Sequence, residues 1–133
     1  MKYVIPSFQR AEIFKSKTLK YLDSMGIDRS EVYVFIREDD PDYEKYNSIQ
    51  GIHLEALDIK GIGETHNYIT HYFAEGEFIV EIDDDLHNII DNERKPIESF
   101  TGLVMEMKQK MQEVGCNYGG TYAVANPMFM SNC

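Results

Sequence analysis

The sequence has few cysteines, few basic residues and no long apolar run, and each shortage narrows what the chain can be. Its two cysteines, Cys116 and Cys133, form neither a disulfide framework nor a Cys-x-x-Cys pair, so we expect a reduced, intracellular setting. Thirteen basic against 23 acidic residues leave a net charge of −10, which argues against tight direct binding of a nucleic-acid backbone. No stretch approaches the roughly 20 apolar residues of a membrane span, and the N-terminus lacks the apolar core of a signal peptide.

The hydrophobic pattern predicts strands that alternate with helices along a chain of 133 residues. We find no internal repeat, low-complexity segment or linker, so one domain is expected. The alternation predicts an α/β fold with a mainly parallel sheet and right-handed crossovers. The expected strands are 3–5, 32–36, 52–57, 78–82 and 121–124, and the expected helices are 11–25, 42–47, 65–73 and 99–114.

Three consecutive carboxylates, Asp83, Asp84 and Asp85, directly follow the apolar strand at 78–82. Three like charges together are unfavourable unless a positive group neutralises them or they face water. Magnesium and related cations bind such oxygen ligands together with substrate phosphates. The run therefore predicts a metal-and-diphosphate site, the alternative being a solvated acidic loop. Because side chains alternate in extended backbone, Asp83 and Asp85 should share one face, with Asp84 turned away.

Three segments that follow predicted strands are expected to meet at one edge of the sheet. They are residues 6–10, residues 37–39 and residues 83–85. In a parallel sheet the carboxyl ends of the strands share an edge, so these loops converge where such sheets bind ligands. Gly61-Ile62-Gly63, which leads into a helix, offers backbone N–H groups to a phosphate, although its spacing is not that of a P-loop.

Several of these segments resemble GT-A fold glycosyltransferases. "VIPSFQR" at 4–10 resembles the opening strand of that family with its Pro-Ser/Thr-Tyr-Asn-Arg end, and "GIGETHNYI" at 61–69 resembles its Gly-x-x-x-Ala-Arg-Asn helix start. "IVEIDDDL" at 79–86 resembles the strand with the Asp-x-Asp motif. "GTYAVANPMFM" at 120–130 resembles the viral and phage group called TET-associated glycosyltransferases. The chain departs from the family pattern at Gln9, where Asn is usual, and at His66, where Arg is usual.

The resemblance implies a GT-A sheet with flanking helices, and it implies roles for individual residues. Pro6, Ser7 and Arg10 would line the base and ribose, and Asp83 and Asp85 would hold Mn²⁺ or Mg²⁺. No catalytic base is assigned. The full set implied to bind the nucleotide sugar is Pro6, Ser7, Arg10, Glu38, Asp39, Gly63, His66, Asn67, Asp83 and Asp84.

The implied activity is the metal-dependent transfer of a sugar from a nucleoside diphosphate sugar to a hydroxyl acceptor. The acceptor is either a hydroxymethylated pyrimidine in viral DNA or a glycan, and the setting is then the cytoplasm of a virus- or phage-infected host. Residues 1–133 would form one nucleotide-sugar-binding domain, incomplete relative to the family. The alternative is a truncated, non-catalytic nucleotide-sugar-binding module that needs a partner. An apolar edge left by missing segments would favour homo-oligomers.

Other residue clusters favour simpler interpretations. His66 and His71 are five residues apart, which does not place them on one helix face for zinc. The acidic run from Glu38 to Asp42 lacks EF-hand spacing, so a solvated loop is expected. A haloacid-dehalogenase phosphatase would carry its acids after the first strand, where this chain has Pro6 and Ser7. A nucleotidyltransferase would need a Gly-rich, basic first loop, and only Arg10 is basic there. The stripe Leu103, Met107, Met111 and Val114 predicts core packing.

Overall fold

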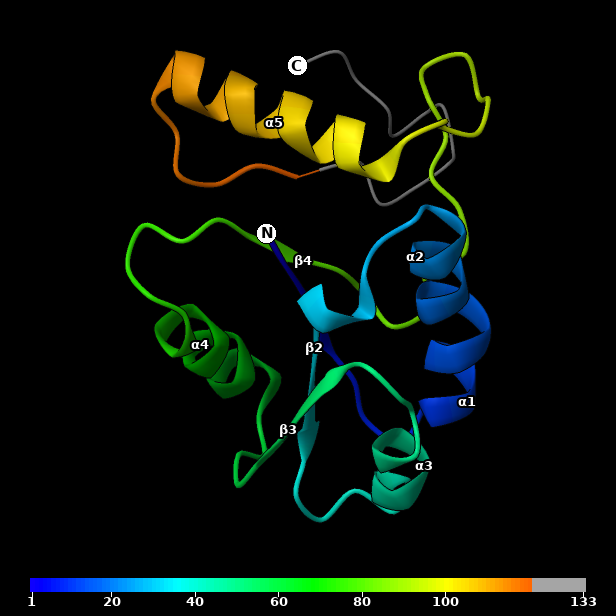
Figure 1. The fold of residues 1–133 in the computed structure, drawn as a ribbon. Helices are drawn as coiled ribbons and strands as arrows, with labels where there is room; N and C mark the ends of the chain where they lie inside the picture. The colour runs from blue at the N-terminus through cyan, green and yellow to red at the C-terminus, as the bar shows by residue number, and fades with distance from the viewer. Residues whose placement is uncertain (121–133) are drawn as a thin grey trace. The chain divides into compact units, whose positions relative to one another are not determined.

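The structure, a computed structural model, describes residues 1–120 of the chain. Two compact units divide the chain, Met1–Phe100 and Thr101–Cys133. The sheet and every predicted site residue belong to the first unit (Figure 1). The strands are β1 (Lys2–Pro6), β2 (Val32–Arg37), β3 (His53–Leu57) and β4 (Ile79–Glu81). The helices are α1 (Ala11–Phe14), the π-helical turn η1 (Lys15–Leu19), α2 (Lys20–Ser24), the 3-10 turn η2 (Arg29–Glu31), α3 (Tyr43–Asn47), α4 (Ile62–Tyr72) and α5 (Phe100–Val114).

The sheet of the described residues has four strands in the order β3-β2-β1-β4, and every pairing is parallel. Tyr3 lies opposite Val32 on β2 and opposite Val80 on β4, which places β1 at the centre. Parallel neighbours need crossover connections, and helices supply them here. The predicted α/β class with a parallel sheet and flanking helices is therefore confirmed.

Helices cover both faces of the sheet, which explains why its central strands are apolar on both sides. On one face, Ile69 of α4 packs on Val4, Phe35 and Leu57. Figure 1 shows α4 on this side and α1, α2 and α3 on the other. There Phe14 and Tyr46 join α1 to α3 through ring contact at 6.4 Å. The two crossovers before β3 thus lie on one face and the crossover before β4 on the opposite face.

The first predicted helix is present, but its middle turn is wider than an α-helix. Residues 11–24 form one helical segment in which Lys15–Leu19 adopts the π form. Turns of this kind are frequent at functional sites. The helix ends in a left-handed cap at Gly26, where φ is 75°, and Ile27 N donates to Leu22 O across the helix end.

Three expectations about the elements need correction or lie beyond the described residues. β4 is Ile79–Glu81, shorter than the predicted strand at 78–82, so Ile82 separates the strand from the three carboxylates. Val114 is 72 % exposed, so the apolar stripe predicted on α5 ends before it. The strand expected at 121–124 and the motif at 120–130 fall on residues that the structure does not describe, apart from Gly120. Among residues 1–120, no helix has the length and apolar character that crossing a bilayer requires.

Candidate functional site

The strand order defines a topological switch point between β1 and β4. The chain proceeds outward from β1 to β2 to β3, and then returns across the sheet to place β4 on the other side of β1. In open α/β sheets, ligands bind at the carboxyl ends of the strands where the order reverses in this way. Residues 7–10 follow β1 and residues 82–85 follow β4. Two of the predicted site loops therefore flank the position that the topology favours for a ligand.

Arg10 joins these two loops through a pair of carboxylates. Its guanidinium Nη1 lies 2.9 Å from Asp84 Oδ1, and its Nη2 lies 3.3 Å from Asp85 Oδ2. The side chain of Asp84 is 7 % exposed, whereas those of Arg10 and Asp85 are 42 % and 47 % exposed. A buried carboxylate is unfavourable without a charged partner, so the Arg10–Asp84 contact is the structural one. The Arg10–Asp85 contact faces water and is weak by comparison.

Asp84 also ends a chain of hydrogen bonds that begins at the backbone of Arg10. Ser7 Oγ donates to Asp84 Oδ2 at 2.7 Å, and Ser7 Oγ lies 2.6 Å from the hydroxyl of Tyr46. The backbone N–H of Arg10 donates to that hydroxyl at 3.1 Å. Because the one proton of Ser7 is used on Asp84, the Tyr46 hydroxyl donates to Ser7. The buried carboxylate is thus held by a directed network as well as by Arg10.

The carboxylate run alternates in burial: Asp83 and Asp85 are exposed and Asp84 is buried. Thr18, in the π turn, fixes the backbone of this run. Its fully buried hydroxyl donates to Asp83 O at 2.6 Å and accepts the N–H of Leu86 at 2.9 Å. The wider helical turn thereby carries a side chain that holds both ends of the acidic turn.

Carboxylates in the segment that follows β2 accept hydrogen bonds from the backbone of the loop after β1 and the start of α1. Asp40, which is 4 % exposed, accepts the backbone N–H of Gln9 at 2.8 Å. Asp42 accepts the N–H of Ala11 at 3.3 Å and so satisfies a donor at the start of α1. The sequence predicted a solvated loop for the acids at 38–42, and Asp40 corrects that expectation because its carboxylate is used internally.

Glu38 and Asp39, by contrast, are exposed at the carboxyl end of β2. Arg37 pairs with Asp39 through two hydrogen bonds of 2.9 and 2.6 Å, and its side chain lies 4.7 Å above the Phe8 ring. The hydrogen bonds from Arg37 hold the pKa of Asp39 below its ordinary value. The third predicted loop therefore reaches the loop after β1 through Arg37 and Phe8.

The loop Gly61-Ile62-Gly63 begins α4, as predicted, with Gly61 at the N-cap position. The hydroxyl of Thr65, one turn inside the helix, donates to Gly61 O. Gly63, His66 and Asn67 are all exposed. His66 Nδ1 pairs with a carboxylate oxygen of Glu81, the last residue of β4. This pair connects α4 to the same switch point, on the sheet face opposite to α1.

Several residues at the site were given no individual role from the sequence, namely Thr18, Arg37, Asp40, Asp42, Tyr46 and Glu81. Tyr46 and Thr18 carry hydroxyl groups and are fully buried. Glu81 interrupts an apolar strand, which is a signal that the sequence offered. The contacts of Tyr46 join residues 39 apart, and no local pattern predicts such a pairing.

Two exposed carboxylates fit a cation that is shared with substrate phosphates. Among residues 1–120, no three His, Cys, Asp or Glu side chains gather as a complete metal site. Magnesium in nucleotide sites commonly takes one or two protein carboxylates, with phosphate oxygens completing the shell. Asp83 and Asp85 provide such donors, while Asp84 is committed to Arg10 and Ser7. Asp85 would exchange its contact with Arg10 for the cation.

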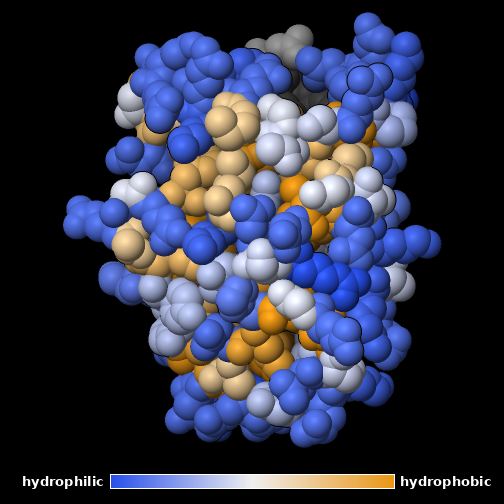
Figure 2. Space-filling view, viewed as in Figure 1, coloured by the Kyte–Doolittle hydropathy of each residue, from blue (hydrophilic) through white to orange (hydrophobic). Residues whose placement is uncertain are grey.

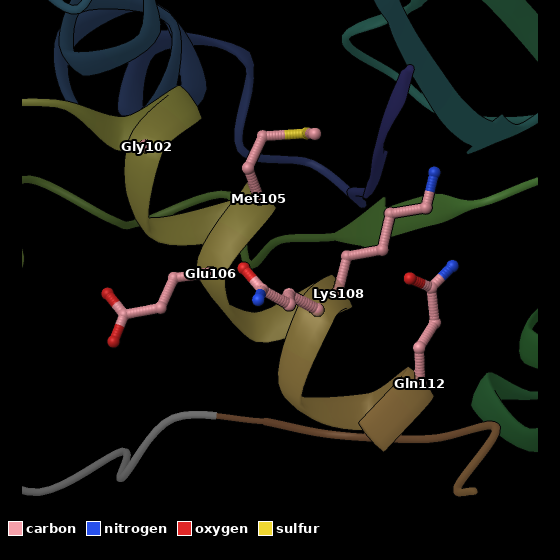
Figure 3. A pocket seen from close by; sticks show the side chains of 6 residues that line it. Gly102, Met105, Glu106, Lys108 and Gln112 are labelled. Atoms are coloured by element: carbon pink, nitrogen blue, oxygen red, sulfur yellow. The ribbon is translucent and has the colours of Figure 1, made fainter. Parts of the chain in front are cut away.

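A hollow of about 560 Å³ lies beside α5 and belongs to the second unit (Figure 3). One acid, one base, two amides and one thioether border it, and none of the predicted site residues does. All of these lining residues lie on α5. The lining residues are Gly102, Met105, Glu106, Lys108, Gln109 and Gln112.

Comparison of the chain with models of protein families, with curated proteins and with solved structures found no match. The sheet and the residues at its switch point therefore carry the information about the class of protein. These define an α/β fold in which Arg10, in the loop after the first strand, meets the acidic turn at the carboxyl edge of a parallel sheet.

Proposed function

We propose that this chain is a metal-dependent glycosyltransferase of the GT-A type, which uses a nucleoside diphosphate sugar as donor and a hydroxyl group as acceptor. One observation carries the proposal: Ser7 and Arg10 after β1 contact Asp84 and Asp85 after β4, at the switch point of a parallel sheet. Two motifs that resemble this family, which lie more than 70 residues apart in the sequence, thus come together. Their meeting place is where α/β sheets bind nucleotides.

In this proposal the residues divide into those that bind the nucleoside and those that face the diphosphate. Pro6, Ser7 and Arg10 lie at the end of β1 and would bind base and ribose, with Glu38 and Asp39 on the neighbouring loop. Asp83 and Asp85 would hold Mn²⁺ or Mg²⁺, which when bound stabilises the charge of the departing diphosphate. His66, with Gly63 and Asn67, approaches the site from α4.

The acceptor in this proposal is a hydroxymethylated pyrimidine of viral DNA or a hydroxyl of a glycan. With a net charge of −10, the chain has no general attraction for a nucleic-acid backbone. A DNA acceptor would therefore reach the site through local contacts or through a partner chain. Supplying each acceptor with the same donor sugar, and measuring the product by mass spectrometry, separates the two acceptors.

Calorimetric titration of nucleoside diphosphates, with Mn²⁺ and with a chelator in its place, tests the donor site. We expect Mn²⁺ to strengthen binding and Asp85→Asn to abolish that gain. Glu12→Gln, which removes one charge from a side chain that is 69 % exposed on α1, serves as the control and should leave affinity unchanged. Equal affinity with and without metal would remove the metal role, and no binding of any nucleoside diphosphate would overturn the proposal.

A transfer assay beside the binding assay separates an enzyme from a binding module. Donor and acceptor must be enclosed together, since water otherwise competes for the activated sugar. The described residues bring together the side chains that we propose bind the donor, and the sequence motifs assign no catalytic base. Metal-dependent binding without transfer, in a preparation that binds stoichiometrically, would favour the non-catalytic module.

A further inference from the structure

The loop that carries Ser7 and Arg10 takes its shape from another part of the chain. Between Ser7 and Ala11, the N–H groups of Gln9, Arg10 and Ala11 donate to side chains of residues 40–46. These acceptors are Asp40, Tyr46 and Asp42, all from the segment between β2 and β3. Hydrogen bonds from side chains to loop backbone satisfy groups that would otherwise need water, and they select one conformation of the loop.

Gln9 shows that this conformation is imposed on the loop. Its φ is 54°, in the left-handed region that residues other than Gly, Asn and Asp rarely adopt. Asp40 Oδ2 accepts the N–H of this residue, while Asp40 Oδ1 accepts the N–H of Asp42 at 2.8 Å. The carboxylate is therefore fixed at both oxygens and is nearly buried. Such backbone persists only when its surroundings determine it.

Tyr46 also holds the loop after β1, through its hydroxyl. It is fully buried, and burial raises the pKa of its phenol, so the hydroxyl stays neutral and can both donate and accept. The hydroxyl accepts from Arg10 N and donates to Ser7 Oγ, which in turn donates to Asp84. Successive hydrogen bonds of this kind strengthen one another in a buried site. The phenol of Tyr46 thus sets the positions of both Ser7 and Arg10.

The geometry assigns Tyr46 and Asp40 as positioning residues, which hold the loop after β1 so that Ser7 and Arg10 face the acidic turn before any ligand arrives. The assignment rests on the proposed function only where it concerns affinity for a nucleoside diphosphate. A loop that is already ordered loses less conformational freedom on binding, so the two residues raise affinity without touching the ligand. Their effect should therefore appear in the exchange of loop amides as well as in binding.

Tyr46→Phe tests this role because it removes a single hydroxyl and keeps the ring. Tyr43→Phe, the same change at a half-buried position of the same helix, is the matched control. By amide hydrogen exchange, we expect Arg10 N–H to exchange about tenfold faster in Tyr46→Phe, the effect of losing one hydrogen bond. The N–H groups of β2, such as that of Val34, should be unchanged. Nucleoside diphosphate affinity should fall about tenfold in Tyr46→Phe and stay constant in Tyr43→Phe.

Asp40→Asn provides a second variant if Tyr46→Phe does not fold. An amide has one acceptor oxygen where the carboxylate has two, so either Gln9 N–H or Asp42 N–H loses its partner. Faster exchange of all amides together, with no excess at residues 9–11, would show a merely structural role and overturn the assignment. Unchanged exchange at Arg10 would also overturn it. If the native chain binds no nucleoside diphosphate, the proposed function fails, yet the exchange measurement still decides the positioning role.

Discussion

Gln9 illustrates how a single residue can be unfavourable for its backbone and still be retained by its contacts. Its left-handed conformation is compatible with Asn, whose short polar side chain tolerates that region better than Gln does. This explains in physical terms why Asn suits the position in the motif that the segment resembles. The N–H of the residue stays bonded to Asp40 whichever side chain is present.

We therefore expect Gln9→Asn to stabilise the chain, by a few tenths up to about 1 kcal/mol. Gln9→Val should destabilise it by about 1–2 kcal/mol, because a β-branched side chain is strained at positive φ. Urea unfolding monitored by circular dichroism measures both. If Gln9→Asn destabilised the chain, the Gln side chain would have a contact whose contribution to stability exceeds the gain from easier left-handed backbone.

Asp84 and Asp85 carry the same charge but should differ in what they support. Asp84 is buried against Arg10 and Ser7, so Asp84→Asn should lower the free energy of unfolding by about 1–3 kcal/mol. Asp85 is exposed and its pair with Arg10 is worth about 0–1 kcal/mol. Asp85→Asn should instead weaken Mn²⁺-dependent nucleotide binding by about tenfold or more, since even residues that only support metal ligands have effects of this size.

Each substitution removes one negative charge, so a general charge effect predicts equal losses for the two variants. Unfolding curves and calorimetric titrations on the same preparations separate the two outcomes. An Asp84→Asn chain that is as stable as the native one would show that the buried ion pair is not a structural contact.

At the level of elements, the π turn η1 connects the first helix to the acidic turn. Thr18 lies within η1 and makes both of its hydrogen bonds to the backbone around Asp83 and Leu86. Thr18→Val keeps the shape of the side chain but leaves a buried N–H and C=O without partners. We expect a loss of about 2 kcal/mol in the free energy of unfolding.

Thr70→Val on α4 is the control for Thr18→Val. Thr70 is exposed and its hydroxyl bonds only within its own helix, so the change should stay within about 0.5 kcal/mol. Thr18→Ser should retain most of the native stability because it keeps the hydroxyl. Equal effects of the two valine substitutions, measured by chemical unfolding, would show that the contacts of Thr18 do not stabilise the turn.

A second connection between elements joins α4 to β3 through Tyr72 and Glu55. The hydroxyl of Tyr72 donates to Glu55 Oε1 at 2.8 Å, and this bond raises the pKa of Tyr72 to about 12. The folded chain then holds the phenolic proton more firmly than the unfolded chain. The contribution to stability is complete below pH about 10 and is lost as the pH rises through about 12.

Thermal unfolding between pH 9 and 12 should therefore show a shallower decline in Tyr72→Phe than in the native chain. Because Tyr72 is 38 % exposed, solvent screening keeps the difference small. Tyr68→Phe, one turn earlier on the same helix, is the control and should keep the native slope. An unchanged slope in Tyr72→Phe would mean that the bond to Glu55 does not persist in solution.

For the whole molecule, the excess of acidic residues is the dominant electrostatic feature. Hydrophilic residues cover much of the face drawn in Figure 2, and apolar residues appear there in separate patches. With a net charge of −10, the folded chain repels itself at low ionic strength. Salt shortens the Debye length from about 30 Å at 0.01 M to about 8 Å at 0.15 M, which screens this repulsion.

We expect the unfolding temperature at pH 7 to rise between these two salt concentrations. Sodium chloride and potassium fluoride should act alike, because screening does not depend on the identity of a monovalent ion. A fall in the unfolding temperature would show that exposed ion pairs, such as Arg29 with Asp23, outweigh the net repulsion.

Local pattern was sufficient to predict most elements of the first unit. Alternating apolar strands and amphipathic helices imply parallel strands, because crossover helices return the chain to the same edge. That rule also predicted that loops after β1, β2 and β4 share one edge. The cap at Gly26 follows from glycine's access to left-handed backbone. These features depend on residues that are near one another in sequence.

Only the tertiary structure decided which residues contact the carboxylates at that edge. The contact of Ser7 with Asp84 spans 77 residues, and that of Gln9 with Asp40 spans 31. The first depends on the crossover through α4, which returns the chain past β1 to β4, and the second depends on β1 and β2 being neighbours. Local periodicity does not encode this strand order, because it is set by the helices that can cover each face of the sheet. The acidic residues were visible in the sequence, but burial separated Asp84 and Asp40, which support the site, from Asp83 and Asp85, which face water.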